Sequence, residues 1–251
     1  MILLIAGATF REAVRSRTFL SLLGLFALGA LLARVVGWIS ATDGHVVTVS
    51  LVLSLQSLIG VLVAVAMGTV LVQSEIQHKT LYTVLSRPLP RWHYVLGKYL
   101  GLAGALALGQ VAMAVIGLGW AWVTGASLSP WLAVAVLLTI AEVLVMAAVS
   151  LCWTALSSPL LAAVLGLATY ALGHAVATLP GLLHHLTGWK QEAVVILAGL
   201  IPNLGPFTYR DLAVHGLPIA WGDLAQRLGY AGLWIALLVV VTLSVVRRRQ
   251  L

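Results

Sequence analysis

One acidic side chain lies in the middle of a long apolar stretch. Glu142 is near the centre of the run 131–156, and an ionisable group at the centre of a membrane costs about 3 kcal/mol or more unless it is paired or hydrated. We expect its helix face to point toward other helices or a cavity. Residues on that face recur at three- and four-residue steps, namely Thr139, Glu142, Met146, Ser150, Trp153 and Ser157.

Two interpretations of Glu142 follow from this position. In the first, a protonated or hydrogen-bonded carboxyl holds helices together, with Gln110 or Gln56 as its partner. In the second, Glu142 carries charge or binds cargo in an intramembrane polar site that includes Gln110 and Ser150.

Seven histidines raise the question of a metal site. His184 and His185 are adjacent, so they point to different faces of a helix, and His174 precedes them by ten residues. His45 is predicted to lie on the same outer side, but no two histidines are spaced i, i+4, as a helical metal site would need. We therefore predict no metal ligands.

Nucleotide-binding and hydrolase signatures are absent from the sequence. The Gly97–Lys98 pair is followed by Tyr99 and lacks the upstream glycine of a P-loop, so the chain cannot bind ATP phosphates in that manner. The motifs H-E-x-x-H and G-x-S-x-G are missing as well. We expect no catalytic residue and no cofactor in this chain.

The composition excludes a soluble globular protein. Of 251 residues, 61% are hydrophobic and 8% are charged, with a net charge of +7, whereas soluble domains carry about a quarter charged residues. The basic residues are too few and too dispersed for a nucleic-acid partner, and a membrane explains them better. The chain is predicted to be an all-α polytopic membrane protein in contact with the lipid bilayer.

Six membrane-spanning helices are predicted within one transmembrane domain, because each span needs about 20 apolar residues. Two long apolar runs are divided where turn-forming residues cluster, at 125–130 and 157–159. The spans are residues 18–39, 47–73, 96–123, 131–156, 160–179 and 227–246. The remaining segments are an interfacial helix at 1–17, a loop at 74–95, and an outer segment at 180–226 with a short outward-facing or re-entrant helix at 193–201.

The distribution of Lys and Arg predicts that both termini are cytoplasmic, because basic residues collect on that side of a membrane. Ten would lie inside: Arg11, Arg15, Arg17, Lys79, Arg87, Arg91, Lys98, Arg247, Arg248 and Arg249. Four would lie outside: Arg34, Lys190, Arg210 and Arg227.

The loop between the second and third spans carries the most informative pattern. Residues 80–85 can form one or two helical turns, Pro88 and Pro90 end them, and Arg91 begins the next span. A short basic helix on the cytoplasmic side is what a soluble motor subunit would push against. The alternative is an ordinary cytoplasmic loop.

This loop resembles the first cytoplasmic loop of ABC-2-type transporter permeases. The resemblance rests on Glu75, Thr80-Leu81, Leu85-Ser86-Arg87-Pro88, Arg91, Gly97-Lys98 and Gly101, and on Ser157-Ser158-Pro159 as the tight inner turn. It implies a second permease copy, as a homodimer, and separate ATPase subunits that bind ATP and Mg. The implied ATPase-coupling residues are Glu75, Thr80, Leu81, Leu85, Arg87, Pro88 and Arg91. The implied location is a bacterial or archaeal cytoplasmic membrane.

Further residues resemble a subgroup that includes the permease of the copper-processing transporter for nitrous oxide reductase maturation. They are Glu142, Leu172-Gly173-His174, Pro202-Asn203, Phe207, Arg210-Asp211 and Val214-His215-Gly216. Lys79 stands where the family often has Gly, so no substrate is carried over.

Two other functions stay open at this point. One is an integral membrane enzyme or metal-binding protein that uses Glu142 and the outer histidines. The other is a non-transporting device, in which ATP-driven movement acts on an outer accessory protein through residues 180–226.

Overall fold

The computed structural model describes residues 1–40, 43–77, 91–177 and 199–248, and in these ranges it is helical without strands. Six described helices are long and apolar enough to cross a membrane, which confirms the prediction of an all-α protein with six spans. The elements are α1 (Ile2–Arg15), α2 (Arg17–Ile39), α3 (Gly44–Gln77), α5 (Arg91–Val123), α6 (Trp131–Leu156), α7 (Pro159–Val176), the 3-10 turn η1 (Gly205–Phe207), α10 (Arg210–Val214) and α11 (Trp221–Arg248).

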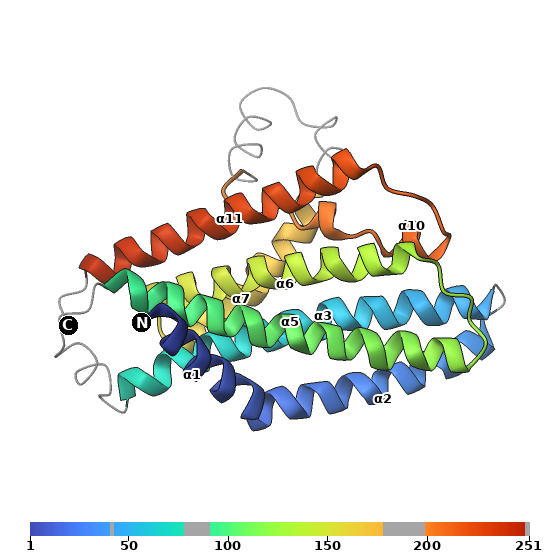
Figure 1. Ribbon diagram of the computed structural model, residues 1–251, viewed down its shortest axis with the longest axis horizontal. Coiled ribbons are helices and arrows are strands. Elements are labelled where there is room, and N and C mark those ends of the chain that lie inside the picture. Colours follow the sequence, from blue (N-terminus) through green and yellow to red (C-terminus); the bar gives the residue numbers. More distant parts are fainter. Residues whose placement is uncertain (41–42, 78–90, 178–198, 249–251) are drawn as a thin grey trace.

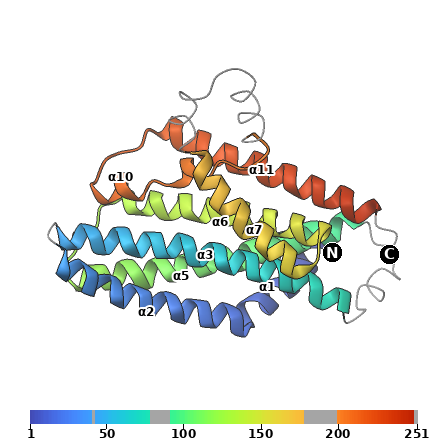
Figure 2. The same cartoon turned by 180° about the vertical axis from the view of Figure 1, so that it is seen from behind.

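The long helices form an elongated bundle with α3 and α6 at its centre (Figure 1). Helix α2 packs against α3 and α5, and α7 packs on the other side against α6 and α3, as the view from behind also shows (Figure 2). Helix α11 runs along α6 and α5. The start of α1 and the end of α11 lie at the same end of the bundle.

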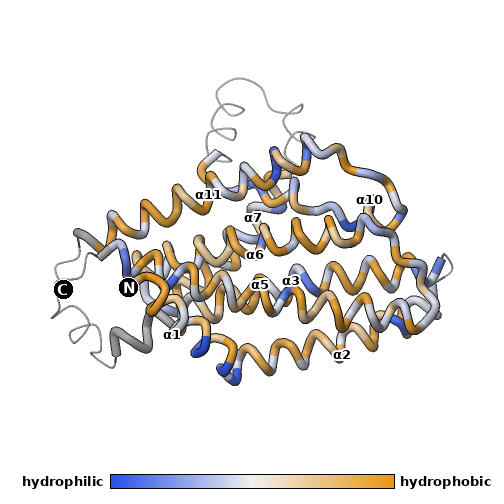
Figure 3. Tube along the Cα trace, viewed as in Figure 1, coloured by the Kyte–Doolittle hydropathy of each residue, from blue (hydrophilic) through white to orange (hydrophobic). Residues whose placement is uncertain are grey.

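Burial separates the central from the peripheral spans. In α6, 67% of the span is buried, compared with 11% in α11 and 17% in α7. Large apolar side chains such as Leu160 and Leu233 point outward, and apolar residues cover most of the length of the helices (Figure 3). A surface of this kind suits lipid tails or another apolar helix, because water does not solvate it favourably.

The first helix packs on α5 through glycines. A Cβ at Gly101 would lie within 2.6 Å of Thr9 Cβ, and one at Gly97 would lie 2.8 Å from Ile5 Cβ. Small residues at this four-residue spacing therefore allow close approach of the two helices. Ser16 separates α1 from α2 in an extended conformation, and its Oγ caps α2 by accepting a hydrogen bond from Phe19 N.

Several helices extend beyond the predicted spans. Helix α3 continues to Gln77 and α5 begins at Arg91, so both enter the segment predicted as a loop at 74–95. Helix α11 begins at Trp221 instead of residue 227. The prediction used charged residues as span limits, but Asp223 lies in the first turn of α11, where the helix dipole favours a negative charge.

Residues 202–216, which contain η1 and α10 and are called the cap segment here, lie over the bundle away from the start of α1 (Figure 1). Leu204 N donates to Gly173 O at 3.0 Å, and Asn203 N donates to the Tyr230 hydroxyl at 2.7 Å. Groups on α7 and α11 therefore satisfy the backbone N–H groups of Leu204 and Asn203. Of the predicted short helix at 193–201, residues 193–198 lie outside the described residues.

Candidate functional site

Glu142 lies on the buried face of α6, with 3% of its surface exposed. Its Oε2 accepts a hydrogen bond of 2.9 Å from Ser57 Oγ on α3. Its Oε1 lies 3.4 Å from His174 Nε2 on α7 and accepts no hydrogen bond among the described residues. Three spans therefore meet at one carboxyl group, as expected for an ionisable side chain inside a membrane bundle.

The cap segment brings a cation to the same place. Arg210, the first residue of α10, lines a small cavity together with Glu142 and Ser57. The cavity has a volume of about 10 Å³, which is about the space that one water molecule occupies. The rest of its lining consists of Leu53, Thr139, Phe207, Thr208 and Tyr209. A negative and a positive side chain thus share a confined polar space where screening by bulk water is weak.

His174 lies between this buried site and the surface of the bundle. Its side chain is 32% exposed, but its Nδ1 atom is buried and has no hydrogen-bond partner among the described residues. The ring packs against Tyr170, with 4.7 Å between ring centroids. Because one ring nitrogen faces Glu142 and the other is unengaged by described groups, this histidine can accept a proton at Nδ1 and release one from Nε2.

The predicted site residues do not all meet. Gln110 pairs with Gln56, whose Nε2 donates to Gln110 Oε1 at 3.0 Å, and Ser150 Oγ donates to Val65 O at 3.2 Å. The expectation that Glu142 pairs with Gln110 or Gln56 is wrong for the bonds described, because its partner is Ser57. The two glutamines instead hydrogen-bond to each other in a second buried polar pair, in which Gln56 Oε1 has no partner among the described residues.

The coupling residues are placed only in part. Thr80, Leu81, Leu85, Arg87 and Pro88 lie outside the described residues. Glu75 belongs to the last turns of α3, and Arg91 begins α5. The backbone at these two positions is helical, and the end of α3 and the start of α5 lie at the same end of the bundle as the start of α1 (Figure 1).

Sequence reasoning missed Ser57 and Arg210 as neighbours of Glu142. Ser57 is 85 positions away along the chain, and helix periodicity identifies a buried face but not the helix that covers it. Arg210 was counted as an outer charge and as part of the subgroup resemblance, but not as a neighbour of Glu142. A usable signal was present, since a carboxylate inside a membrane requires a counter-charge and Arg210 follows the aromatic Tyr209 in an otherwise weakly charged segment.

The geometry does not support covalent catalysis. Serine, histidine and an acid are all present, but Ser57 donates to Glu142 and not to a histidine. A nucleophilic serine needs a base that takes its proton.

Among the residues that the structure describes, no group of three or more His, Cys, Asp or Glu side chains could hold a metal ion. His45 lies 3.3 Å from Arg34 Nη1, and His184 and His185 lie outside the described residues.

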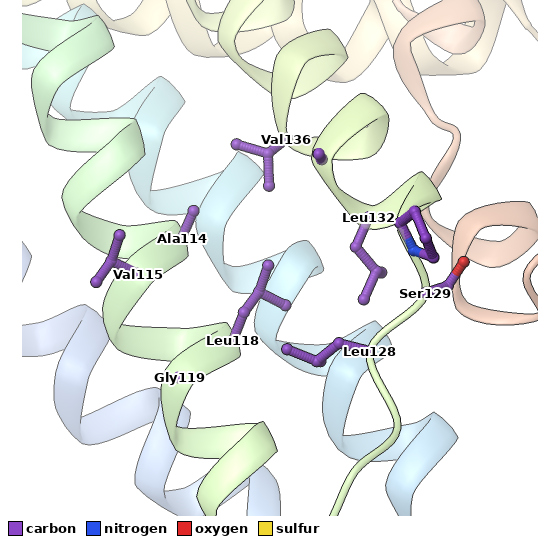
Figure 4. A pocket seen from close by; sticks show the side chains of 10 residues that line it. Ala114, Val115, Leu118, Gly119, Leu128, Ser129, Leu132 and Val136 are labelled. Carbon is purple, nitrogen blue, oxygen red and sulfur yellow. The ribbon is translucent and has the colours of Figure 1, made fainter.

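A larger groove of about 500 Å³ opens between α5 and α6 (Figure 4). Its walls are almost entirely apolar, with Leu118 and Val115 on α5 facing Leu132 and Val136 on α6, and Ser129 at its edge. It is therefore a site for hydrocarbon and offers no group for acid–base or metal chemistry.

Comparison with known families places this architecture. Residues 3–180 match the family model described as ABC-2 family transporter protein. The chain belongs to the ABC-2 transporter family. The matched residues of this ABC-2 chain run from α1 through α7 and include Ser57, Glu142 and His174, whereas the cap segment follows the matched range. No curated protein was found to match the sequence. The chain is therefore a membrane component of a transporter and not itself the catalytic one.

Proposed function

We propose that this chain is the permease subunit of an ABC transporter and that separate ATPase subunits drive it. The match of residues 3–180 to the ABC-2 family carries the proposal. The sequence has no P-loop, so ATP and Mg would bind in the partner chain. Hydrolysis there would drive export, or movement of an accessory protein on the outer side of the membrane.

The loop between α3 and α5 is the proposed ATPase-coupling element. The helices that flank it end at Gln77 and begin at Arg91, at the same end of the bundle as the start of α1 (Figure 1). Seven of the chain's basic residues belong to α1, to the start of α2, or to this loop and the start of α5, and three more follow at the C-terminal end. The seven are Arg11, Arg15, Arg17, Lys79, Arg87, Arg91 and Lys98. This supports a cytoplasmic location of that end and an outer location of the cap segment.

A second permease copy is proposed to complete the transporter. The weakly buried spans α2, α7 and α11 present broad apolar faces, and such faces can associate within the bilayer. The resemblance of residues near Glu142 and Arg210 to the permease of the copper-processing transporter for nitrous oxide reductase maturation stays a proposal at the level of subgroup and assigns no substrate.

Co-purification with the ATPase tests the proposed function. Leu81→Asp and Leu85→Asp should dissociate the ATPase or uncouple its turnover, because apolar anchors in a pocket dominate such interfaces. Arg91→Ala should do less, because charges at a rim mainly set association rate and salt dependence. If both aspartate variants retain the ATPase with normal stimulated turnover, this loop is not the coupling element, and the turn at 157–159 becomes the candidate.

A further inference from the structure

The charge balance around Glu142 depends on a segment outside the spans. Three of the six described spanning helices contain an acidic residue: Glu75 in the last turn of α3, Asp223 in the first turn of α11, and Glu142 in the middle of α6. The cation that shares a cavity with Glu142 belongs to the cap segment. We propose that Glu142 is a proton-binding site that controls the cap segment: the ionised carboxylate holds the cap closed through Arg210, and a proton delivered by His174 releases it.

Other groups around Glu142 do not replace Arg210. From α3 the facing group is the neutral hydroxyl of Ser57, and from α7 the facing groups are His174 and Tyr170. Tyr209 lines the cavity as well, but its hydroxyl donates to Leu217 O. The nearby titratable side chains of α5 and α11 bond elsewhere: Tyr99 to Leu144 O, Arg227 to Pro206 O, and Tyr230 to Asn203 N.

The cap segment is built so that one charge can decide its position. Helix α10 has five residues, and a helix of that length is not stable without tertiary contacts. Its other described attachments involve no acidic side chain: Leu204 N donates to Gly173 O, Asn203 N donates to Tyr230 Oη, and Arg227 donates to Pro206 O. Three residues of the cap segment are themselves buried: Phe207, Tyr209 and Ala213. Removal of the negative charge from Glu142 leaves Arg210 in a confined space without a counter-charge, which favours its return to water.

His174 provides the route for the proton. Nδ1 is buried in the structure, so water must enter beside the 32%-exposed ring before a proton from the outer aqueous phase can bind Nδ1; the proton on Nε2 then passes to Glu142 Oε1 across 3.4 Å. Histidine ends neutral in its other tautomer, and the carboxylate becomes a carboxylic acid. The net charge of the cavity is then one unit more positive than before, because the carboxylate has been neutralised while Arg210 keeps its charge. The reverse transfer restores the carboxylate that shares the cavity with Arg210 and closes the cap.

Cysteine labelling of a buried cap residue tests the proposal in the full chain within right-side-out membrane vesicles. Ala213 is buried on α10 while its neighbour Leu212 is 45% exposed. The variants are Ala213→Cys and, as a matched control, Leu212→Cys, each with Cys152→Ala. The rate of reaction with an impermeant maleimide is measured for the cysteine at position 213 and divided by the rate for the cysteine at position 212. This labelling ratio cancels the pH dependence of the thiol itself, because both thiols ionise. This ratio should rise as pH falls, with a slope of up to about tenfold per pH unit for one linked proton.

Charge variants identify the group that responds. Glu142→Gln and Arg210→Gln should each raise the labelling ratio and abolish its pH dependence. Tyr230→Phe removes a neutral attachment of the cap, so it should raise the ratio at all pH values and leave the slope intact. His174→Gln should keep the final ratio of the parent but slow its response to a pH jump. A pH-independent ratio in the parent, or an unchanged slope in Glu142→Gln, overturns the proposal.

This inference rests on the proposed function for the outer location of the cap segment. Different experimental results would contradict the inference and the proposed function. Failure of the unaltered chain to co-purify with an ATPase would contradict the proposed function and leave the labelling result standing. Labelling of Ala213→Cys only in inverted vesicles, with the same pH slope, would overturn both the proposed orientation and the outer origin of the proton. Size-exclusion chromatography of each variant ensures that the labelled protein is folded.

Discussion

Gln56 on α3 and Gln110 on α5 are joined by reciprocal hydrogen bonds inside the bundle. Gln56 Nε2 donates to Gln110 Oε1 at 3.0 Å and to Gln110 O at 3.2 Å, and Gln110 Nε2 reaches Gln56 O at 3.4 Å. Both side chains are at most 1% exposed. Gly60, one turn from Gln56, gives the Gln110 amide its space, because a Cβ there would overlap Gln110 Nε2.

Breaking this glutamine pair from one side should destabilise the bundle more than replacing both members. Gln110→Leu leaves a buried amide of Gln56 without its partner, at an expected cost of about 1–2 kcal/mol. The double variant Gln56→Leu with Gln110→Leu should recover part of that loss. The free energy of unfolding in mixed micelles measures both. Equal destabilisation in the double and single variants would show that the pair contributes no net coupling.

The α1–α5 contact should fail when its glycine is filled. Gly101→Ala places a methyl group 2.5 Å from Ala6 O, so α1 must move away from α5. We expect faster tryptic cleavage at Arg11 and Arg15 in the purified protein. Gly119→Ala is the control on the same helix, because no atom lies within 4 Å of the added carbon. Protection that is unchanged in Gly101→Ala would mean that the backbone adjusts without loss of the contact.

Arg34 should contribute to stability by linking three helices. Its Nη2 donates to Thr124 O at the end of α5 at 3.2 Å, and its Nη1 lies 3.3 Å from His45 Nδ1 near the start of α3. Arg34→Lys cannot reproduce both contacts, because an ammonium is a point donor and a guanidinium is a planar fork. We expect a lower melting temperature, equivalent to about 1 kcal/mol. Arg17→Lys on the exposed side of the same helix is the control. Equal melting temperatures for the two variants would contradict the prediction that Arg34 stabilises the bundle by linking helices.

Reporter fusions should place both termini in the cytoplasm. Ten of the 14 basic residues are assigned to the inner side, so the positive-inside rule favours this orientation. Single cysteines at Lys79 and Arg249 should be accessible from inside, and one at Lys190 from outside, all in a Cys152→Ala background. Cytoplasmic accessibility of position 190 would contradict the arrangement of six spans with 180–226 outside.

Much of the fold follows from apolar run length. The run 131–156 was predicted with the bounds that α6 has in the structure, because Pro130 precedes it and Ser157-Ser158-Pro159 follows it. The start of α11 could not be placed in this way. Its first turns contain Asp223 and Arg227, which look like a loop in sequence, but Arg227 bonds Pro206 O of the cap segment.

The site was less predictable than the fold, because its contacts join distant parts of the chain. Periodicity correctly placed Glu142 on a buried face of α6. It could not select Ser57 over the glutamines, since all three are polar residues on neighbouring helices. Arg210 reaches the cavity through the path of the cap segment, which depends on tertiary contacts such as Leu204 N to Gly173 O.

The position of Glu142 also has a consequence for biosynthesis. Helices enter the membrane in chain order, so α3 with Ser57 is already present when α6 is synthesised, while His174 and Arg210 come later. The nascent α6 must therefore insert with a single neutral donor available to its carboxyl group, at a cost of about 3 kcal/mol that its many apolar residues offset. A chain truncated after residue 177 would contain α6 and α7 but not Arg210, so the carboxyl group of Glu142 would have to remain in the bundle without this cation.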